Sequence, residues 1–288
     1  MTAGNLTIGD LRAAGTRRLQ QAAAAGGAST PELDAEVLLA HVLSVSRAYL
    51  RSRPEATAGE RAAEYQALID RRARGEPLAY LTGTREFWSL PLTVTPAVLV
   101  PRPETELLVE RALALRGEPY GRVADLGTGC GAVALALASE RPRWCVTATD
   151  VSADALAVAR ANAARLGLAA IDFRVGSWFT PLAAQRFDLI LSNPPYVATC
   201  DPALADPALA HEPRLALTPG ADALECLRAI ARDAPQHLTP GAWLLLEHGA
   251  EQAAPVRHEL VLAGFRYVRS HRDPAGHERV TEGQYGQL

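Results

Sequence analysis

The feature that most constrains the fold is a regular alternation of short apolar segments with helical segments beyond residue 120. The apolar segments are RVADL (122–126), WCVTATD (144–150), IDFRVG (171–176), FDLILS (187–192) and AWLLLEH (242–248). Between them lie stretches such as SADALAVARANAARLG (152–167) and ADALECLRAIARDAPQHL (221–238), in which apolar residues recur at helical spacing. Strands that alternate with helices are typical of a mostly parallel sheet covered by helices. The sequence therefore predicts an α/β fold.

The chain before this region has a different pattern. Alanine-rich segments with helical spacing run from Thr7 to about Gly75, and short segments of period two follow, separated by glycine and proline. We expect a small all-helical domain over residues 1–75, a hairpin-bearing linker over 76–100 and the α/β domain over 101–288.

Two stretches of the N-terminal region indicate where helices begin. In STPEL, Ser29 or Thr30 can cap a helix that has Pro31 in its first turn, where the missing N–H is not needed. In TAGE, Thr57 can cap a second helix while Glu60 reaches back to complete a capping box.

Composition excludes several classes of protein. With 29 basic and 32 acidic side chains the net charge is −3, so no overall cationic field would attract a nucleic acid, and we expect none as substrate. No leader pattern or membrane-length apolar run is present, and we expect a soluble, cytoplasmic, monomeric protein without a membrane partner. The four cysteines and seven histidines show no ligand spacing, so no metal is expected.

A glycine-rich loop follows the first apolar segment in VADLGTGCG. Gly127, Gly129 and Gly131 have the spacing G-x-G-x-G, whereas dinucleotide-binding loops have G-x-G-x-x-G. Asp125 lies beside the loop, where its carboxylate would repel a phosphate and attract an ammonium or sulfonium group. The loop therefore favours S-adenosylmethionine, which carries both cations and no phosphate.

Two further residues are candidates for this cofactor. Asp150 ends the second apolar segment, where a carboxylate can accept both ribose hydroxyls of an adenosine, although it can equally precede a helix that Ser152 caps. Trp178 follows the third segment and can stack on an adenine or anchor a loop.

The motif SNPPYV directly follows the apolar segment FDLIL. Pro194 and Pro195 restrict the backbone, so that the Asn193 side-chain oxygen and the Pro194 carbonyl are held as two neighbouring acceptors beside the ring of Tyr196. Two acceptors suit one NH₂ group. Holding both its hydrogens would aim the nitrogen lone pair at a sulfonium methyl group, so that positioning replaces a general base.

With these motifs the chain resembles the S-adenosylmethionine-dependent amino-methyltransferases that carry an N-P-P-Y motif, and within them the bacterial peptide chain release factor glutamine methyltransferases. The shared motifs are EFW (86–88), VLVPRPETE (98–106), DLGTGCG (125–131), SNPPY (192–196), HEPRLAL (211–217) and LLLEHG (244–249). The resemblance implies a Rossmann-like seven-stranded class I methyltransferase sheet. It also implies transfer of a methyl group to N5 of the glutamine in the Gly-Gly-Gln motif of class I release factors.

The resemblance further implies roles for individual residues. The residues implied to contact the cofactor are Gly127, Thr128, Gly129, Cys130, Gly131, Asp150, Trp178 and Asn193. Asn193, Pro194, Pro195 and Tyr196 are implied to bracket the substrate glutamine, with Asn193, Pro194 and Tyr196 taking part in catalysis.

Four residues near these motifs are less clear. Relatives usually carry an acidic residue where this chain has Ser177, whose hydroxyl is a weaker acceptor for an adenine amino group. Arg102 can help to organise the pocket or approach the peptide backbone, although Pro103 and the acidic residues after it also suit a helix start. Glu247 and His248 end a strand, and we expect a structural role for them rather than catalysis.

Other functions remain open from the residues. The same motif suits adenine N6 in DNA or guanine N2 in RNA, but those substrates require a cationic groove. The basic cluster RRARG (71–75) is explained by a helix C-terminus. A glutamine of a ribosomal protein is a nearer alternative, and a binding module without catalysis is a third.

Overall fold

A computed structural model describes residues 6–23 and 30–286 of the chain. By its internal contacts the chain divides into two compact units, of which one comprises Met1–Thr84 with Ala205–His211 and the other Arg85–Leu204 with Glu212–Leu288. Within the described residues, no helix is long and apolar enough to cross a membrane.

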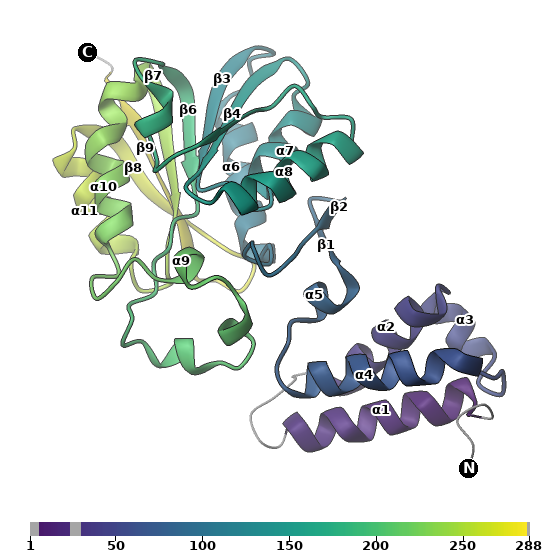
Figure 1. Cartoon of the computed structure of the whole chain (residues 1–288). Coiled ribbons are helices and arrows are strands. Elements are labelled where there is room, and N and C mark those ends of the chain that lie inside the picture. The colour runs from purple at the N-terminus through teal and green to yellow at the C-terminus, as the bar shows by residue number, and fades with distance from the viewer. Residues whose placement is uncertain (1–5, 24–29, 287–288) are drawn as a thin grey trace. The chain divides into compact units, whose positions relative to one another are not determined.

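The first unit is helical (Figure 1). Its helices are α1 (Ile8–Ala23), α2 (Pro31–Leu43), α3 (Arg47–Ser52), α4 (Ala62–Ala73) and α5 (Leu78–Thr82), with a 3₁₀ turn, η2, at Gly59–Arg61. Fully buried apolar side chains from α1, α2 and α4, among them Leu19, Leu38, Leu39 and Ile69, form its core. Most of the stability of helices in proteins comes from tertiary packing, so this shared core holds the unit together.

The two predicted helix starts have different outcomes. Helix α2 begins at Pro31 with Thr30 at its N-cap position, but the Thr30 side chain makes no capping hydrogen bond, and its hydroxyl donates to Asp34 Oδ1 at 2.8 Å instead. The other predicted cap, Ser29, lies outside the described residues. The capping box at Thr57 is wrong, because α4 begins at Ala62 and no side chain caps either it or the 3₁₀ turn before it. Thr57 instead pairs with Thr7 in an isolated antiparallel bridge, which holds its backbone extended.

Part of a later loop belongs to this helical unit. The segment Ala205–His211 begins at the last residue of the 3₁₀ turn η5 (Pro202–Ala205) and contains the 3₁₀ turn η6 (Leu209–His211). The His211 ring lies 3.4 Å from the Arg74 carbonyl oxygen. Gly75 has φ +95°, and a Cβ there would lie 2.7 Å from Pro207, so only glycine fits this contact.

The second unit is built on a seven-stranded sheet (Figure 1). Its strands are β3 (Gly121–Leu126), β4 (Trp144–Asp150), β5 (Asp172–Val175), β6 (Phe187–Ser192), β7 (Leu238–Glu247), β8 (Phe265–Arg272) and β9 (Glu278–Tyr285). The strand order is β5-β4-β3-β6-β7-β9-β8, and only β9 runs antiparallel to its neighbours. The predicted α/β fold with seven strands is confirmed.

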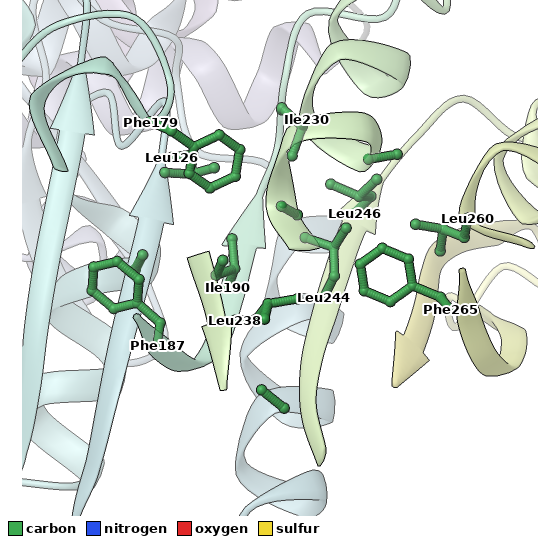
Figure 2. Packing of buried hydrophobic residues seen from close by; sticks show 14 of the residues in the cluster. Leu126, Phe179, Phe187, Ile190, Ile230, Leu238, Leu244, Leu246, Leu260 and Phe265 are labelled. Atoms are coloured by element: carbon green, nitrogen blue, oxygen red, sulfur yellow. The ribbon is translucent and has the colours of Figure 1, made fainter. Parts of the chain in front are cut away.

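Helices cover both faces of this sheet (Figure 1). One face carries α6 (Glu106–Leu115), α7 (Ala132–Glu140) and α8 (Ala153–Arg165), and the other carries α10 (Glu225–Asp233) and α11 (Ala253–Leu262). Figure 2 shows Leu126, Ile190, Leu244 and Leu246 of the strands in one buried apolar cluster with Ile230 of α10. The core therefore fixes β3, β6 and β7 side by side, with their carboxyl ends at one edge.

Short elements complete the second unit. They are the 3₁₀ turns η3 (Pro103–Thr105), η4 (Thr180–Leu182) and η7 (Ala234–His237), and the short helix α9 (Arg214–Leu217). A hairpin of β1 (Thr84–Phe87) and β2 (Leu90–Thr93) precedes the sheet.

The hairpin is attached to the helices beside the glycine loop. Trp88 and Ser89 both have positive φ, as a two-residue hairpin turn requires. The Trp88 N–H donates to Glu106 Oε1 at 2.8 Å, and Thr93 N–H donates to Asn162 Oδ1 of α8 at 2.7 Å. The Asn162 amide nitrogen in turn donates to the Cys130 carbonyl oxygen in the glycine loop.

Candidate active site

A cavity of about 370 Å³ lies where the loops that follow β3, β4 and β6 meet. Loops after the carboxyl ends of parallel strands form the usual ligand site of an α/β sheet. Of the residues that the sequence singles out for the cofactor and the substrate, those lining the cavity are Gly127, Thr128, Gly129, Cys130, Asp150, Trp178, Asn193 and Pro195. Gly131, Pro194 and Tyr196 lie next to these but do not line it.

The glycine loop turns sharply between β3 and α7. Gly127, Gly129 and Gly131 have φ of +74°, +57° and +89°, a region that favours glycine. The backbone N–H groups of Gly127 and Thr128 both donate to the Thr149 carbonyl oxygen of β4 at 2.9 Å. Two adjacent strands therefore fix the floor of the cavity.

Asp125 stabilises this turn from inside. Its Oδ2 accepts from the Thr128 hydroxyl at 2.6 Å and from the Ala134 N–H at 3.2 Å. Burial raises the pKa of Asp125 to about 6, although these two hydrogen bonds lower it. The carboxylate that the sequence assigns to attraction of a cation thus also anchors the loop and the start of α7.

Asp150 holds the loop from the other side. Its Oδ2 accepts from the Gly129 N–H and its Oδ1 from the Ser152 N–H, both at 2.9 Å. The Ser152 hydroxyl accepts from the Ala155 N–H and caps α8, as the sequence allows. Burial raises the pKa of Asp150 while these N–H groups lower it. Its carboxylate lies at the cavity with a fixed orientation.

Trp178 forms a wall of the cavity in a strained conformation. Its φ is +45°, which is uncommon for a bulky residue, and its carbonyl oxygen accepts from the Thr149 hydroxyl at 3.1 Å. A Cβ at Gly127 would lie 3.2 Å from the Trp178 ring. The indole ring therefore lies against the glycine loop, and both residues line the cavity.

The motif after β6 is tied to buried groups behind the cavity. The Asn193 side-chain nitrogen donates to the Thr105 hydroxyl at 3.1 Å, and the Tyr196 hydroxyl donates to Glu247 Oε1 at 3.4 Å. The Tyr196 carbonyl oxygen accepts from the Gln252 amide at 2.9 Å. Asn193 is thereby held by its side-chain nitrogen, and it lines the cavity.

Glu247 and His248 differ in what surrounds them. Glu247 is fully buried, and burial raises its pKa to about 7 although Thr105 and Arg279 lower it. His248 is buried against Thr281 Oγ1, at 2.7 Å from its Nε2, and burial lowers its pKa. The His248 ring contacts Gly249 and Thr281, whereas Glu247 contacts Tyr196 of the N-P-P-Y motif.

An ion pair fixes the rim of the cavity. Arg102 donates to the buried carboxylate of Glu212 at 2.6 Å, and the Val100 N–H donates to the same carboxylate at 3.1 Å. Arg102 and the chain after Glu212, including Pro213 and Leu215, line the cavity.

The sequence did not indicate the roles of two residues of this site. Thr105 lies inside the motif VPRPETE and Glu212 inside HEPRLAL, so the motifs were visible but the roles of these residues were not. Their partners Asn193 and Arg102 are 88 and 110 positions away, and only the folded chain brings them together. Among the described residues, no group of three or more His, Cys, Asp or Glu could hold a metal ion.

Comparison with known proteins gives two family matches in this chain. Residues 10–83 match the PrmC N-terminal domain, and residues 103–222 match the methyltransferase small domain. The second match contains the glycine loop, Asp150, Trp178 and the N-P-P-Y motif.

Several similar proteins align with most or nearly all of this chain. The release factor glutamine methyltransferase of Xylella fastidiosa (strain Temecula1) is 50% identical over 88% of this chain and 92% of its own length. That of Vibrio cholerae is 46% identical over 98% of both chains. Among solved structures, a methyltransferase from Pyrococcus furiosus aligns with TM-score 0.54 and 20% identity, covering 78% of this chain and all of its own, which supports the fold.

Proposed function

The chain belongs to the release factor glutamine methyltransferase family, and from that premise we propose that it methylates N5 of the glutamine in the Gly-Gly-Gln motif of class I release factors. The observation that carries this proposal is the position of Asn193. Its side-chain nitrogen is engaged by Thr105, so its oxygen is the group available at the cavity.

The cavity fits S-adenosylmethionine by its shape and its donor set. The close approach of Gly127 to the Trp178 ring forms a narrow apolar wall, and the oriented Asp150 carboxylate suits a pair of ribose hydroxyls. Thr128, Gly129 and Cys130 would contact the cofactor from the loop, and Gly131 lets α7 begin close behind it. When bound, the cofactor supplies an electrophilic methyl group on a sulfonium sulfur.

The N-P-P-Y motif would hold the substrate amide. The Asn193 Oδ1 and the Pro194 carbonyl oxygen would accept the two hydrogens of the glutamine NH₂, while Pro195 and Tyr196 would confine the side chain. Asn193 and Pro195 line the cavity, and Pro194 and Tyr196 are their neighbours in the chain. An amide nitrogen is a poor nucleophile because its lone pair is delocalised, and these two acceptors favour the pyramidal geometry that directs the lone pair at the methyl carbon.

The bonds made and broken balance without a base. The nitrogen–carbon bond forms as the carbon–sulfur bond breaks, and that electron pair stays on sulfur. The methylated amide then loses one proton to water, which Asn193 cannot take because it has no titratable group at neutral pH.

The test is mass spectrometry of a digested release factor after incubation with the purified chain and S-adenosylmethionine. We expect a gain of one methylene on the Gly-Gly-Gln peptide, with the modified atom located by fragmentation. The N193A variant should bind the cofactor and lose the reaction. Ribosomal proteins and DNA are incubated in parallel reactions. Methylation of either of them while the release factor stays unmodified would contradict the substrate assignment.

A further inference from the structure

The N-P-P-Y segment, residues 193–196, is stiff because of its two prolines. Each proline ring fixes its own φ, and each proline also restricts the residue before it to extended backbone. The prolines have no N–H, so no backbone donor can hold the segment at these two positions. The position of the segment at the cavity therefore depends on the groups that bind its two ends.

Hydrogen bonds from two separate elements hold these ends. At the first end, the Asn193 side-chain nitrogen donates to Thr105 Oγ1 at 3.1 Å. At the other end, the Tyr196 carbonyl oxygen accepts from the Gln252 side-chain nitrogen at 2.9 Å. Thr105 belongs to η3, whereas Gln252 is the N-cap residue of α11. A stiff segment that is held at both ends keeps the atoms between them in place, and these include the Pro194 carbonyl oxygen.

The Gln252 side chain is itself fixed by the turn that follows β7. Its Oε1 accepts from the Gly249 N–H at 2.9 Å, and the Gln252 N–H donates back to the Gly249 carbonyl oxygen at 2.9 Å. A Cβ at Gly249 would lie 3.2 Å from Gln252 Oε1, so the turn and the side chain are in close contact. Because a backbone N–H only donates and a carbonyl oxygen only accepts, one orientation of the amide satisfies both partners.

We infer that Gln252 is a positioning residue for methyl transfer. It does not line the cavity, and it acts through the Tyr196 carbonyl oxygen. This inference rests on the proposed function, since it concerns how the Pro194 carbonyl oxygen and the Tyr196 ring face the substrate amide. Without the Gln252 donor, one end of the segment loses its constraint, and the two acceptors lose their fixed geometry.

The substitution Q252E changes one donor into an acceptor. The new carboxylate keeps an oxygen for the Gly249 N–H, but its second oxygen faces the Tyr196 carbonyl oxygen, so that two acceptors meet. A protonated carboxyl group has an O–H that restores the donor. The ordinary pKa of a glutamate is about 4.3, and partial burial beside a carbonyl oxygen raises that of the new group. The defect of Q252E should therefore diminish as the pH falls from about 8 to about 5.

Gln284 of β9 provides the matched control. Its side-chain nitrogen donates to the Gly241 carbonyl oxygen of β7 at 2.8 Å, and Gln284 is half-buried, as Gln252 is. Q284E therefore makes the same chemical change to the same type of hydrogen bond, outside the N-P-P-Y segment and the residues that hold it.

Kinetics give the first readout. With saturating cofactor and release factor at pH of about 8, Q252A and Q252E should lower kcat about tenfold, while titration shows unchanged affinity for S-adenosylmethionine. Relative to wild type at each pH, Q252E should recover in acid and Q252A should not. Q284E should match wild type throughout. A wild-type kcat in Q252A and Q252E, or an equal loss in Q284E, would overturn the inference.

Nuclear magnetic resonance follows the segment without any substrate. The chain has two Tyr-Val pairs, at 196–197 and 267–268, so ¹³C-carbonyl tyrosine with ¹⁵N-valine gives two carbonyl-to-amide correlations. Y267F removes one correlation and thereby identifies that of Tyr196. Loss of the hydrogen bond in Q252A should move the Tyr196 carbonyl signal upfield, and the Tyr267 signal should stay in place. In Q252E acid should return the Tyr196 signal toward its wild-type position.

Failure of the inference and failure of the proposed function are distinguishable. If wild type methylates no release factor, the proposed function fails, and the Tyr196 carbonyl signal still shows whether Gln252 holds the segment. An unmoved Tyr196 signal in both Gln252 variants would contradict that hold. If wild type methylates the release factor and Q252A keeps the rate, the positioning role fails and the proposed function stands.

Discussion

At the scale of single residues, the contact between Gly127 and Trp178 decides the shape of the proposed cofactor site. We expect G127A to weaken S-adenosylmethionine binding by roughly tenfold or more, because the new Cβ would press on the ring in addition to the cost of positive φ, about 1–2 kcal/mol. The Cβ would lie 3.2 Å from the Trp178 ring. Isothermal titration with the cofactor measures the change.

The matched control for G127A is G129A. Gly129 also has positive φ, but a Cβ there meets no atom within 4 Å. G129A should therefore show the backbone cost alone and a smaller loss of affinity. Equal losses in the two variants would mean that the indole ring does not shape the site.

At the scale of elements, the carboxylate of Glu212 joins two rim segments that the chain separates by more than a hundred residues. E212A should leave Arg102 and the Val100 N–H without their acceptor and destabilise the rim locally by about 1–2 kcal/mol. We keep the figure low because Arg102 is about one third exposed. Faster hydrogen exchange of the Val100 amide measures the effect.

The control for this rim is an ion pair that solvent already screens. Arg232 and Asp233 pair at 2.8 Å with 72% and 43% of their side chains exposed, so D233A should leave Val100 exchange unchanged. If E212A also left the hydrogen exchange of the Val100 amide unchanged, Glu212 would not stabilise the rim.

At the scale of the whole molecule, each unit has its own hydrophobic core. We propose that the helical unit recognises the release factor while the second unit binds the cofactor and carries out the chemistry. Deleting residues 1–75 should leave cofactor affinity nearly unchanged. It should lower methylation of an intact release factor by about a hundredfold or more, because the second attachment point is lost.

Titration with the cofactor and the release factor assay measure this deletion separately. A short Gly-Gly-Gln peptide is the control, since it needs no recognition by the helical unit and should be methylated at similar low rates by both forms. Full activity of the shortened chain on intact release factor would contradict the proposed role.

Much of the fold could be predicted from local sequence patterns. The apolar segments RVADL, WCVTATD and FDLILS correspond to strands β3, β4 and β6. They could be predicted because the spacing of apolar residues and the length of each segment indicate a buried strand. The capping box at Thr57 failed, because a bridge to Thr7 outweighed a local hydrogen bond. The insertion of antiparallel β9 between β7 and β8 also depends on pairing between distant segments.

The candidate site likewise depends partly on local sequence and partly on tertiary structure. The sequence by itself determined that a glycine loop, Asp150, Trp178 and Asn193 follow strands of one sheet, since strand ends and turn residues are local properties. Only the tertiary structure decided that Thr105 contacts Asn193 and that Glu247 contacts Tyr196, because hydrogen bonds between remote residues exist only once the strands have packed. The residue types of the proposed site are therefore encoded locally, whereas their orientation is a property of the folded core.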